Sequence, residues 1–252
     1  MSLRLTLWRL LVLAFLALVC LQLYFAARIT AMRFVYPEST AFQRAQMYEL
    51  IGRGEFHWNQ EGVSGAKIHD NLRRAVIASE DADFVNHTGV EWDAIEKARK
   101  RNERTQARIE AKLKRDPNAK VPALKLVGGS TITQQLAKNL FLSGERSMAR
   151  KGQELVLTYM LEAILGKERI LDIYLNSVEW GSGIFGAQAA AQYYFKVDAA
   201  RLSPQQAARL AVMLPAPRRF EKTPQSPYLR KRTNAILRRM GDASLPEDSS
   251  SE

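Results

Sequence analysis

The segment GGSTITQQLAKN, residues 128–139, predicts the start of an amphipathic α-helix and, with it, a mainly α-helical fold. Its two glycines are typical of a turn, and Thr131 and Gln134 have the spacing of a helix-capping box. At about 100° per residue, four apolar side chains share the face expected to meet a core: Ile132, Leu136, Ala137 and Leu140. The opposite stripe carries hydroxyl, amide and ammonium groups, from Thr131, Gln135, Lys138 and Asn139.

This polar stripe has two interpretations. All of its groups can donate hydrogen bonds to oxygen, and the free N–H groups at a helix start also favour an anion. An ordinary exposed helix face would have a similar outline. The spacing alone therefore leaves an anion site as a hypothesis.

Upstream, the segment EDADFVNHTG at residues 80–89 begins with a carboxylate that can act as a base. Glu80 ends a stretch with helical apolar spacing, where burial can raise the pKa of a carboxyl group. A solvated acidic turn is the alternative. Downstream, Arg150 and Glu154 lie four residues apart on one predicted helix face, either as part of a site or as a surface ion pair. A base opposite a cationic cradle suits an alcohol that displaces a phosphate-type leaving group.

Composition points to an anionic partner. The chain has 252 residues, of which 46% are hydrophobic and 25% charged, as in ordinary globular proteins. Its net charge of +11 is unusual and favours nucleic acid, anionic lipid or a phosphorylated substrate. The single cysteine, Cys20, excludes an internal disulfide framework.

Residues 10–28 are predicted to form a transmembrane anchor. The run from Leu10 to Ala27 has no charged residue, and about eighteen helical residues just span a hydrocarbon core. A cleaved signal peptide is the alternative, although this run is longer than the usual apolar region of one. Basic residues on the two sides nearly balance, so charge alone does not orient the anchor.

Most of the remaining chain has helical periodicity. Helices are predicted at about residues 72–80, 90–115, 131–140, 148–165, 167–175, 184–194, 203–214 and 226–240. Residues 30–70 mix aromatic and polar residues, and their glycine-rich part, residues 51–67, is predicted to hold turns and short strands. Residues 241–252 are predicted to form a disordered tail. These patterns predict residues 1–9 as an N-terminal segment and residues 29–240 as one large helical domain.

Residues 97–125 carry a net charge of +8 from eleven basic and three acidic residues. A solvated helix with many salt bridges is one interpretation. Contact with an anionic membrane surface is the other. Nucleic acid is disfavoured because no aromatic residue lies among these charges and no nucleic-acid motif is present.

Taken together, the motifs closely resemble those of the monofunctional peptidoglycan glycosyltransferases, the biosynthetic transglycosylases of glycosyltransferase family 51. The resemblance covers residues 71–220. Its motifs, in order, are E-D-x-x-F-x-x-H-x-G at 80–89, G-G-S-T-x-T-Q-Q-x-x-K-N at 128–139, R-K-x-x-E at 150–154, K-x-x-I-L-x-x-Y-L-N at 167–176, a Gly/Ala stretch at 181–195 and L-P-A-P at 214–217. So many ordered motifs make a chance match very unlikely.

The resemblance implies a single transmembrane helix and a two-lobed, lysozyme-like α-helical domain that polymerises lipid II. The growing glycan would pass, with inversion, from undecaprenyl pyrophosphate to the 4-hydroxyl of lipid II. Glu80 would be the general base, and Glu154 a second glutamate that organises Arg150, the substrate or a metal. Lys138 and Arg150 would bind the pyrophosphate, and Thr131, Gln135 and Asn139 would line the cleft. No cofactor is required, while magnesium or manganese is allowed.

The implied setting is the bacterial inner membrane with a periplasmic catalytic domain, facing membrane lipid and cell-wall synthesis proteins, without nucleic acid. Two features depart from the family pattern: Leu126-Val127 stand where an arginine or glutamine is common, and residues 99–120 resemble an insertion. Too few residues follow the last motif for a transpeptidase domain, which implies a monofunctional enzyme. The rivals are a membrane-anchored muramidase or lytic transglycosylase, which needs no pyrophosphate cradle, and a basic membrane scaffold.

Overall fold

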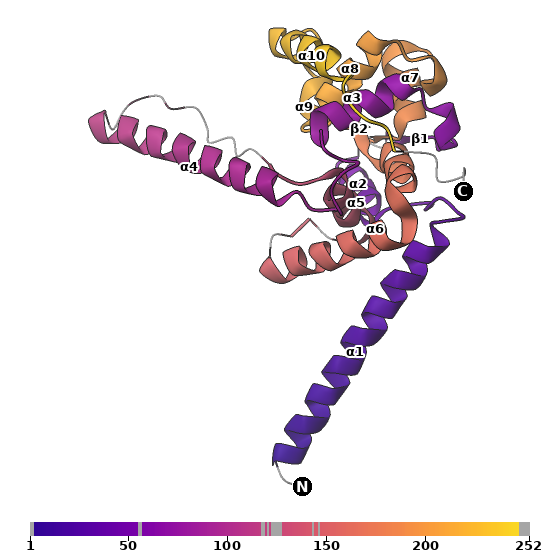
Figure 1. The fold of residues 1–252 in the computed structure, drawn as a ribbon, viewed down its shortest axis with the longest axis vertical. Coiled ribbons are helices and arrows are strands. Elements are labelled where there is room, and N and C mark those ends of the chain that lie inside the picture. The colour runs from indigo at the N-terminus through magenta and orange to yellow at the C-terminus, as the bar shows by residue number, and fades with distance from the viewer. Residues whose placement is uncertain are drawn as a thin grey trace.

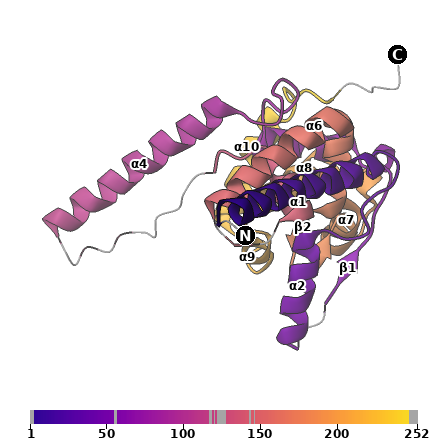
Figure 2. The same cartoon turned by 90° about the horizontal axis from the view of Figure 1, so that it is seen from below.

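The computed structural model describes residues 3–54, 57–116, 119, 121, 128–142, 144–145 and 147–246. Helices dominate it, as Figure 1 shows. Helix α1 (Leu3–Ala31) and helix α4 (Trp92–Arg115) project from the body in different directions, which Figure 2 shows from below. The predicted mainly α-helical class is therefore confirmed.

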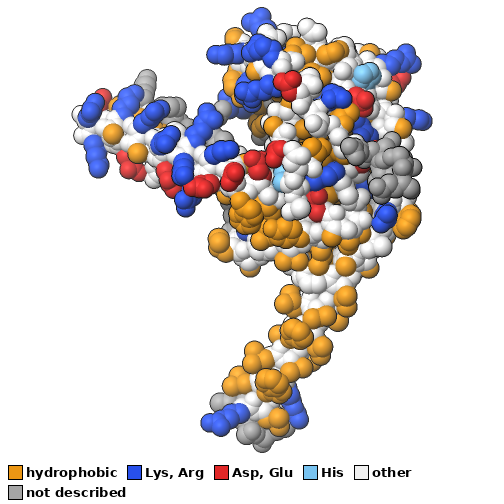
Figure 3. Space-filling view, in the orientation of Figure 1, with side chains coloured by type: hydrophobic (Ala, Val, Ile, Leu, Met, Phe, Trp, Pro, Cys, Tyr) orange, Lys and Arg blue, Asp and Glu red, His pale blue; other side chains and the backbone are white. Residues whose placement is uncertain are grey.

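Helix α1 has the properties of a membrane-spanning helix. Residues Arg4–Ala31 contain a window of mean hydropathy 2.5 that the rest of the protein does not bury. A core helix of the same composition would be covered by the protein. Figure 3 shows hydrophobic side chains along most of α1, with basic side chains near its N-terminal end. Length and composition thus make α1 a candidate anchor.

Two groups of packed helices build the body. In the first, α3 (Asp70–Glu80) packs against α8 (Pro204–Met213), which also packs against α10 (Pro227–Arg239). In the second, α5 (Ile132–Phe141) packs along α6 (Met148–Ser177) and beside α2 (Ala41–Gly52). Leu136 and Leu140 of α5 share one buried cluster with Leu157 and Leu161 of α6. Each such leucine contributes about 1.5–3 kcal/mol through burial.

A small sheet and several short elements complete the body. Strand β3 (Ile184–Phe185) lies between β1 (Asn59–Gln60), to which it is parallel, and β2 (Glu179–Gly181), to which it is antiparallel. Asn59 pairs with Ile184, and Glu179 pairs with Phe185. The other elements are η1 (Gly65–Lys67), α7 (Ala187–Phe195), η2 (Ala199–Arg201) and α9 (Pro217–Glu221).

Several predicted boundaries agree closely with the structure. Gly166 has φ 75° and ψ 166°, a non-helical geometry that separates the two predicted halves of α6. The capping box at Thr131 is present, with the Gln134 side chain accepting from the Thr131 N–H. The helix predicted from residue 184 begins instead at Ala187, because Ile184 and Phe185 pair with β1 and β2.

One helix between residues 30 and 70 was not predicted. Helix α2 lies almost wholly before the glycine-rich residues 51–67, and the described part of 51–67 contains a turn, strand β1 and η1. The start of α2 has a readable signal, because Thr40 and Gln43 form a second capping box. The predicted tail is described only as far as residue 246, so residues 247–252 lie outside the described part of the chain.

Candidate active site

Glu80 is the last residue of α3 and lies where the two helix groups meet. Leu72, Val76 and Ile77 are buried and fix the inward face of α3. The Glu80 carboxylate accepts a hydrogen bond from Ser79 Oγ at 3.3 Å and one from Gln135 Nε2, on α5, at 3.2 Å. Burial raises the pKa of Glu80, and these two hydrogen bonds lower it by less. The result is a carboxyl group with increased basicity.

The side-chain amide of Gln135 is held in one orientation by a hydrogen bond from Tyr174. The Tyr174 hydroxyl donates a hydrogen bond to Gln135 Oε1 at 2.9 Å, which leaves the Gln135 NH₂ group directed at Glu80. Tyr174 is fully buried, and burial together with the charge of Glu80 raises its pKa. Because the phenol therefore stays protonated, it remains a donor and fixes which end of the amide meets the carboxylate.

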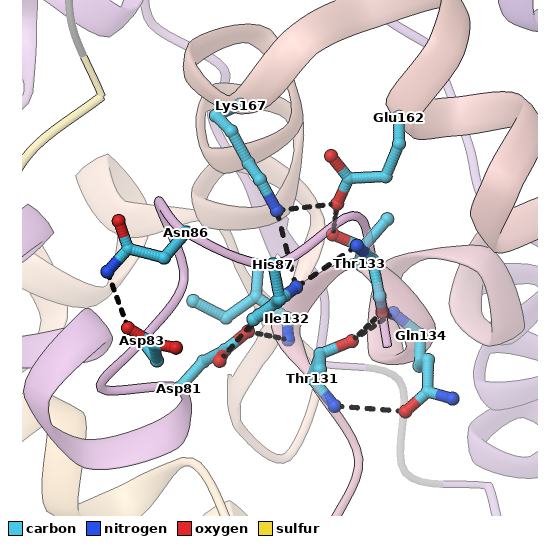
Figure 4. A network of polar contacts seen from close by, with 11 residues as sticks. Asp81, Asp83, Asn86, His87, Thr131, Ile132, Thr133, Gln134, Glu162 and Lys167 are labelled. Atoms are coloured by element: carbon cyan, nitrogen blue, oxygen red, sulfur yellow. Dashed lines mark hydrogen bonds and ion pairs between the residues drawn. The ribbon is translucent and has the colours of Figure 1, made fainter. Parts of the chain in front are cut away.

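Asp81, the next residue after Glu80, ties the base to the start of α5. Its Oδ2 accepts the Ile132 N–H at 2.9 Å, and its Oδ1 lies 2.9 Å from His87 Nε2 (Figure 4). The Gly89 N–H donates to His87 Nδ1 at 3.0 Å, so Nε2 carries the proton toward Asp81. A carboxylate at a helix N-terminus is also favoured by the helix dipole.

A second set of polar contacts holds the same loop against α6. Lys167 Nζ lies 2.8 Å from Glu162 Oε1 and 3.4 Å from His87 Nδ1, and Thr133 donates to Glu162 at 2.6 Å (Figure 4). Gly129 permits a close approach on the other side, because a Cβ there would lie 2.8 Å from Ile95 Cα. The Glu80–Gly89 loop, the turn before α5 and α6 are therefore fixed relative to one another.

A polar pocket of about 410 Å³ opens along the same face of α5. Its described lining residues are Phe42, Ala45, Gln46, Ser130, Gln134, Gln135, Lys138, Asn139, Leu142, Gly144, Arg150, Lys151 and Glu154. Three basic side chains and one acidic side chain face this space. A pocket with that charge excess suits a phosphate-type anion.

The charges in the pocket are arranged around Glu154. Arg150 Nη1 lies 3.1 Å from Glu154 Oε2, and Lys151 Nζ contacts the other carboxylate oxygen. Desolvation lowers the pKa of Lys138; Glu154 opposes this effect, and the charges of Arg150 and Lys151 add to it. Arg150 Nε is buried without a hydrogen-bond partner among the described residues. The cluster therefore retains donors that a bound anion can satisfy.

The structure brings together all but one of the predicted site residues. Five of them line the pocket: Gln135, Lys138, Asn139, Arg150 and Glu154. Glu80 adjoins this wall through Gln135. Thr131 differs from the expectation, since its buried hydroxyl donates to Gly89 O at 2.6 Å and accepts from the Gln134 N–H. Its side chain caps α5 and stands outside the pocket lining.

Sequence reasoning missed the wall contributed by α2. Phe42 and Gln46 line the pocket, and Gln46 Oε1 is buried without a hydrogen-bond partner among the described residues. No motif marks these positions, and the helix that carries them was not predicted. Lys151 was also left out, although it stands beside Arg150 in the R-K-x-x-E motif. Leu126 and Val127, the departure before the glycine pair, lie outside the described residues.

The metal-binding side chains of the described residues are not grouped as a metal site requires. No group of three or more His, Cys, Asp or Glu side chains is arranged there to hold an ion. Glu154 is the only carboxylate among the described lining residues, and two basic side chains already contact it. Use of magnesium or manganese remains an untested prediction.

Comparison with known proteins agrees with this geometry. The sequence model described as Transglycosylase matches residues 48–241. A biosynthetic peptidoglycan transglycosylase of Burkholderia thailandensis is 53% identical over 89% of this chain and 82% of its own length. Proteins with the same description from Herminiimonas arsenicoxydans (50% identical; 96% of this chain, 98% of the relative) and Janthinobacterium sp. (49%; 97% and 99%) align nearly end to end. The chain belongs to the transglycosylase family, as a biosynthetic peptidoglycan transglycosylase.

Proposed function

We propose that this chain polymerises the glycan strands of peptidoglycan from lipid II. The growing strand, held on undecaprenyl pyrophosphate, is the donor, and the 4-hydroxyl of the N-acetylglucosamine of an incoming lipid II is the acceptor. That oxygen attacks the anomeric carbon of the donor, the bond to the pyrophosphate breaks, and the anomeric configuration inverts from α to β. The observation that supports this best is the single polar wall formed by Glu80, Gln135 and the cationic pocket.

In this reaction Glu80 takes the proton of the acceptor hydroxyl. A general base works best when it is ionised and still basic, and burial moves the pKa of Glu80 in that direction. Gln135 donates a hydrogen bond to the carboxylate and, through Tyr174, limits its rotation. The base is therefore held in place before the acceptor arrives.

The leaving pyrophosphate is stabilised by the basic side chains of the pocket. Lys138 and Arg150 line it together with Asn139, and all three can donate hydrogen bonds to phosphoryl oxygens. Preorganised donors of this kind stabilise the charge that develops as a leaving group departs. Glu154 orients Arg150 and Lys151 through its two carboxylate oxygens. We assign Glu154 this positioning role.

The domain arrangement belongs to the same proposal. Residues 10–28 would cross the inner membrane, with residues 1–9 in the cytoplasm and the catalytic domain, residues 29–240, in the periplasm. The substrate is itself a membrane lipid, so an anchored enzyme meets it in two dimensions. Other cell-wall synthesis proteins are expected nearby.

The test is to incubate the purified full-length protein with labelled lipid II in detergent and to separate the products by size. The wild type should form long glycan chains, and Glu80→Gln should form none. Asp83→Asn is the matched control, because Asp83 is an exposed carboxylate of the same loop. Polymer from Glu80→Gln at the wild-type rate would refute the base assignment. Fragments from a preformed sacculus without consumption of lipid II would favour the muramidase instead.

A further inference from the structure

One polar side chain interrupts the exposed apolar part of α1, and it has a specific partner. Gln22 Nε2 donates to Gln153 Oε1 at 2.9 Å, and Gln153 Nε2 donates back to Gln22 Oε1 at 3.1 Å. Gln153 lies on the first half of α6. The two amides therefore satisfy each other reciprocally, which matters most where no water can replace either partner.

The amide pair is one end of a continuous contact between α1 and the body. Phe25 meets Phe141 edge-on, with ring centroids 5.3 Å apart, and the Arg28 guanidinium lies 5.3 Å from the Phe141 ring centroid. Further along, Ile29 and Met32 are buried in the core. From Gln22 onward α1 is thus docked in one register against α5 and α6.

Gln153 also stands next to the pocket. It directly precedes Glu154 and follows Arg150 and Lys151, all of which line the pocket. Successive residues of a helix differ by about 100° in direction and 1.5 Å in height, so one turn of α6 meets both the anchor and the pocket. The height of Gln22 in the membrane consequently fixes the height of Glu154.

Other surface features place this turn of α6 near lipid. Gln22 precedes Arg28 by six residues, about 9 Å along a helix, so a membrane whose headgroups surround Arg28 has the amide pair just inside its apolar layer. Met148, Val156 and Tyr159 of α6 expose large apolar side chains to solvent in the protein alone. A surface of this kind suits the boundary between hydrocarbon and headgroups.

We propose that Gln22 and Gln153 are positioning residues that hold the pyrophosphate pocket at the level of the lipid headgroups. A one-turn slip of α1, about 5.4 Å, would leave both amides unpaired in an apolar environment, so the pair selects one register. This inference rests on the proposed function and on α1 spanning the membrane. It gives a structural reason for a polar residue within the anchor.

The test compares a bilayer-held substrate with a soluble one. Wild type, Gln22→Leu, Gln153→Leu and the double variant are assayed in liposomes with lipid II, and in detergent with a water-soluble short-prenyl analogue. In liposomes each single variant should raise KM about three- to tenfold with little change in kcat, and the double variant should match the singles. With the short-chain analogue all four proteins should have the same KM.

The control is Leu23→Ala, which alters a side chain on the exposed face of α1. This variant should keep the wild-type KM both for lipid II in liposomes and for the short-prenyl analogue in detergent. An unchanged KM in liposomes for both single variants would overturn the proposal. An equal rise in KM with both substrates would also overturn it, because such a rise indicates a general structural role. A wild type that forms no polymer from either substrate would instead refute the proposed function.

Discussion

At Glu80, burial and hydrogen bonding act on one carboxyl group with opposite signs. Burial is the larger effect and raises its pKa, while Gln135 and Ser79 lower it. A base must be ionised to work, so the acidic limb of the pH–rate profile should lie above the range of an ordinary glutamate. Gln135→Leu removes a lowering contribution and should move that limb to still higher pH. Initial rates between pH 4.5 and 8 check this; a limb that moves down would contradict the assigned contact.

The same pKa shift predicts how stability depends on pH. Because the folded-state pKa of Glu80 is raised, its favourable contribution is fully present below its unfolded pKa and is lost as pH rises through the folded value. Glu80→Gln should therefore unfold at a higher temperature than the wild type near pH 7.5, although it is inactive. The difference should shrink toward pH 4. Thermal unfolding at both pH values measures it, and a destabilised variant at pH 7.5 would contradict the sign.

Lys138 and Lys151 line one pocket but should not be equivalent. Both side chains are exposed, but Lys151 is paired with Glu154, whereas desolvation lowers the pKa of Lys138 on the α5 wall of the pocket. Lys138→Ala should lower kcat/KM about 100- to 1,000-fold, as the loss of a preorganised donor does. Lys151→Ala should cost about tenfold or less, because the Lys151 ammonium is already paired with Glu154 in an exposed ion pair. Steady-state rates with lipid II decide between these values, and equal losses would refute the distinction.

Individual site residues were predictable where chemistry and spacing coincide. Gln135, Lys138 and Asn139 follow from the helical period, and the Arg150–Glu154 ion pair follows from a spacing of four. Thr131 was harder to place, since the hydroxyl that satisfies a capping box cannot also face a pocket. Gln46 could not be predicted, because its position depends on how α2 packs beside α5.

The stability of helix α5 depends on the hydrogen bonds at its N-terminus. Asp81 accepts hydrogen bonds from two buried partners, Ile132 N–H and His87, and is itself 4% exposed. In Asp81→Asn one of these acceptors becomes an NH₂ group that faces a donor. The loss of one hydrogen bond to a charged group, about 1.5–3 kcal/mol, should lower the unfolding temperature by roughly 3–10 °C.

The matched control for this change is Asp83→Asn, on an exposed side chain that contacts only Asn86 among the described residues. Its unfolding temperature should stay at the wild-type value in the same detergent. An Asp81→Asn protein as stable as this control would show that the Asp81 contacts do not hold α5.

The boundaries of helices were predictable where local sequence signals set them. The prediction was wrong where a strand pairs with a partner far away in the sequence. The kink at Gly166 and the start of α5 follow from residues near them in sequence. Strand β3 displaced the expected start of α7 because it pairs with β1, more than a hundred residues earlier in the chain. The hydrophobic periodicity of a segment does not indicate which distant segment it will pair with.

Across the whole molecule, charge and apolar surface are segregated onto the two projecting helices. α1 exposes apolar side chains, whereas α4 exposes mostly basic ones (Figure 3). Part of α4 carries ion pairs within the helix, as Lys100–Glu96 and Arg99–Glu103 do, which fits a solvated helix. Contact between this helix and anionic lipid stays a prediction.

The boundary between anchor and body can be located from burial. Ile29 is fully buried and Met32 nearly so, and Arg169 donates to Met32 O at 2.8 Å while its guanidinium lies 3.9 Å from the Tyr36 ring centroid. A protein shortened to begin at Ala27 retains all of these contacts, whereas one beginning at Pro37 retains none. Burying two such side chains contributes about 3–6 kcal/mol. The longer form should thus be more stable than the shorter form by about that much in chemical denaturation. Equal stability of the two forms would move the boundary of the folded domain beyond Tyr36.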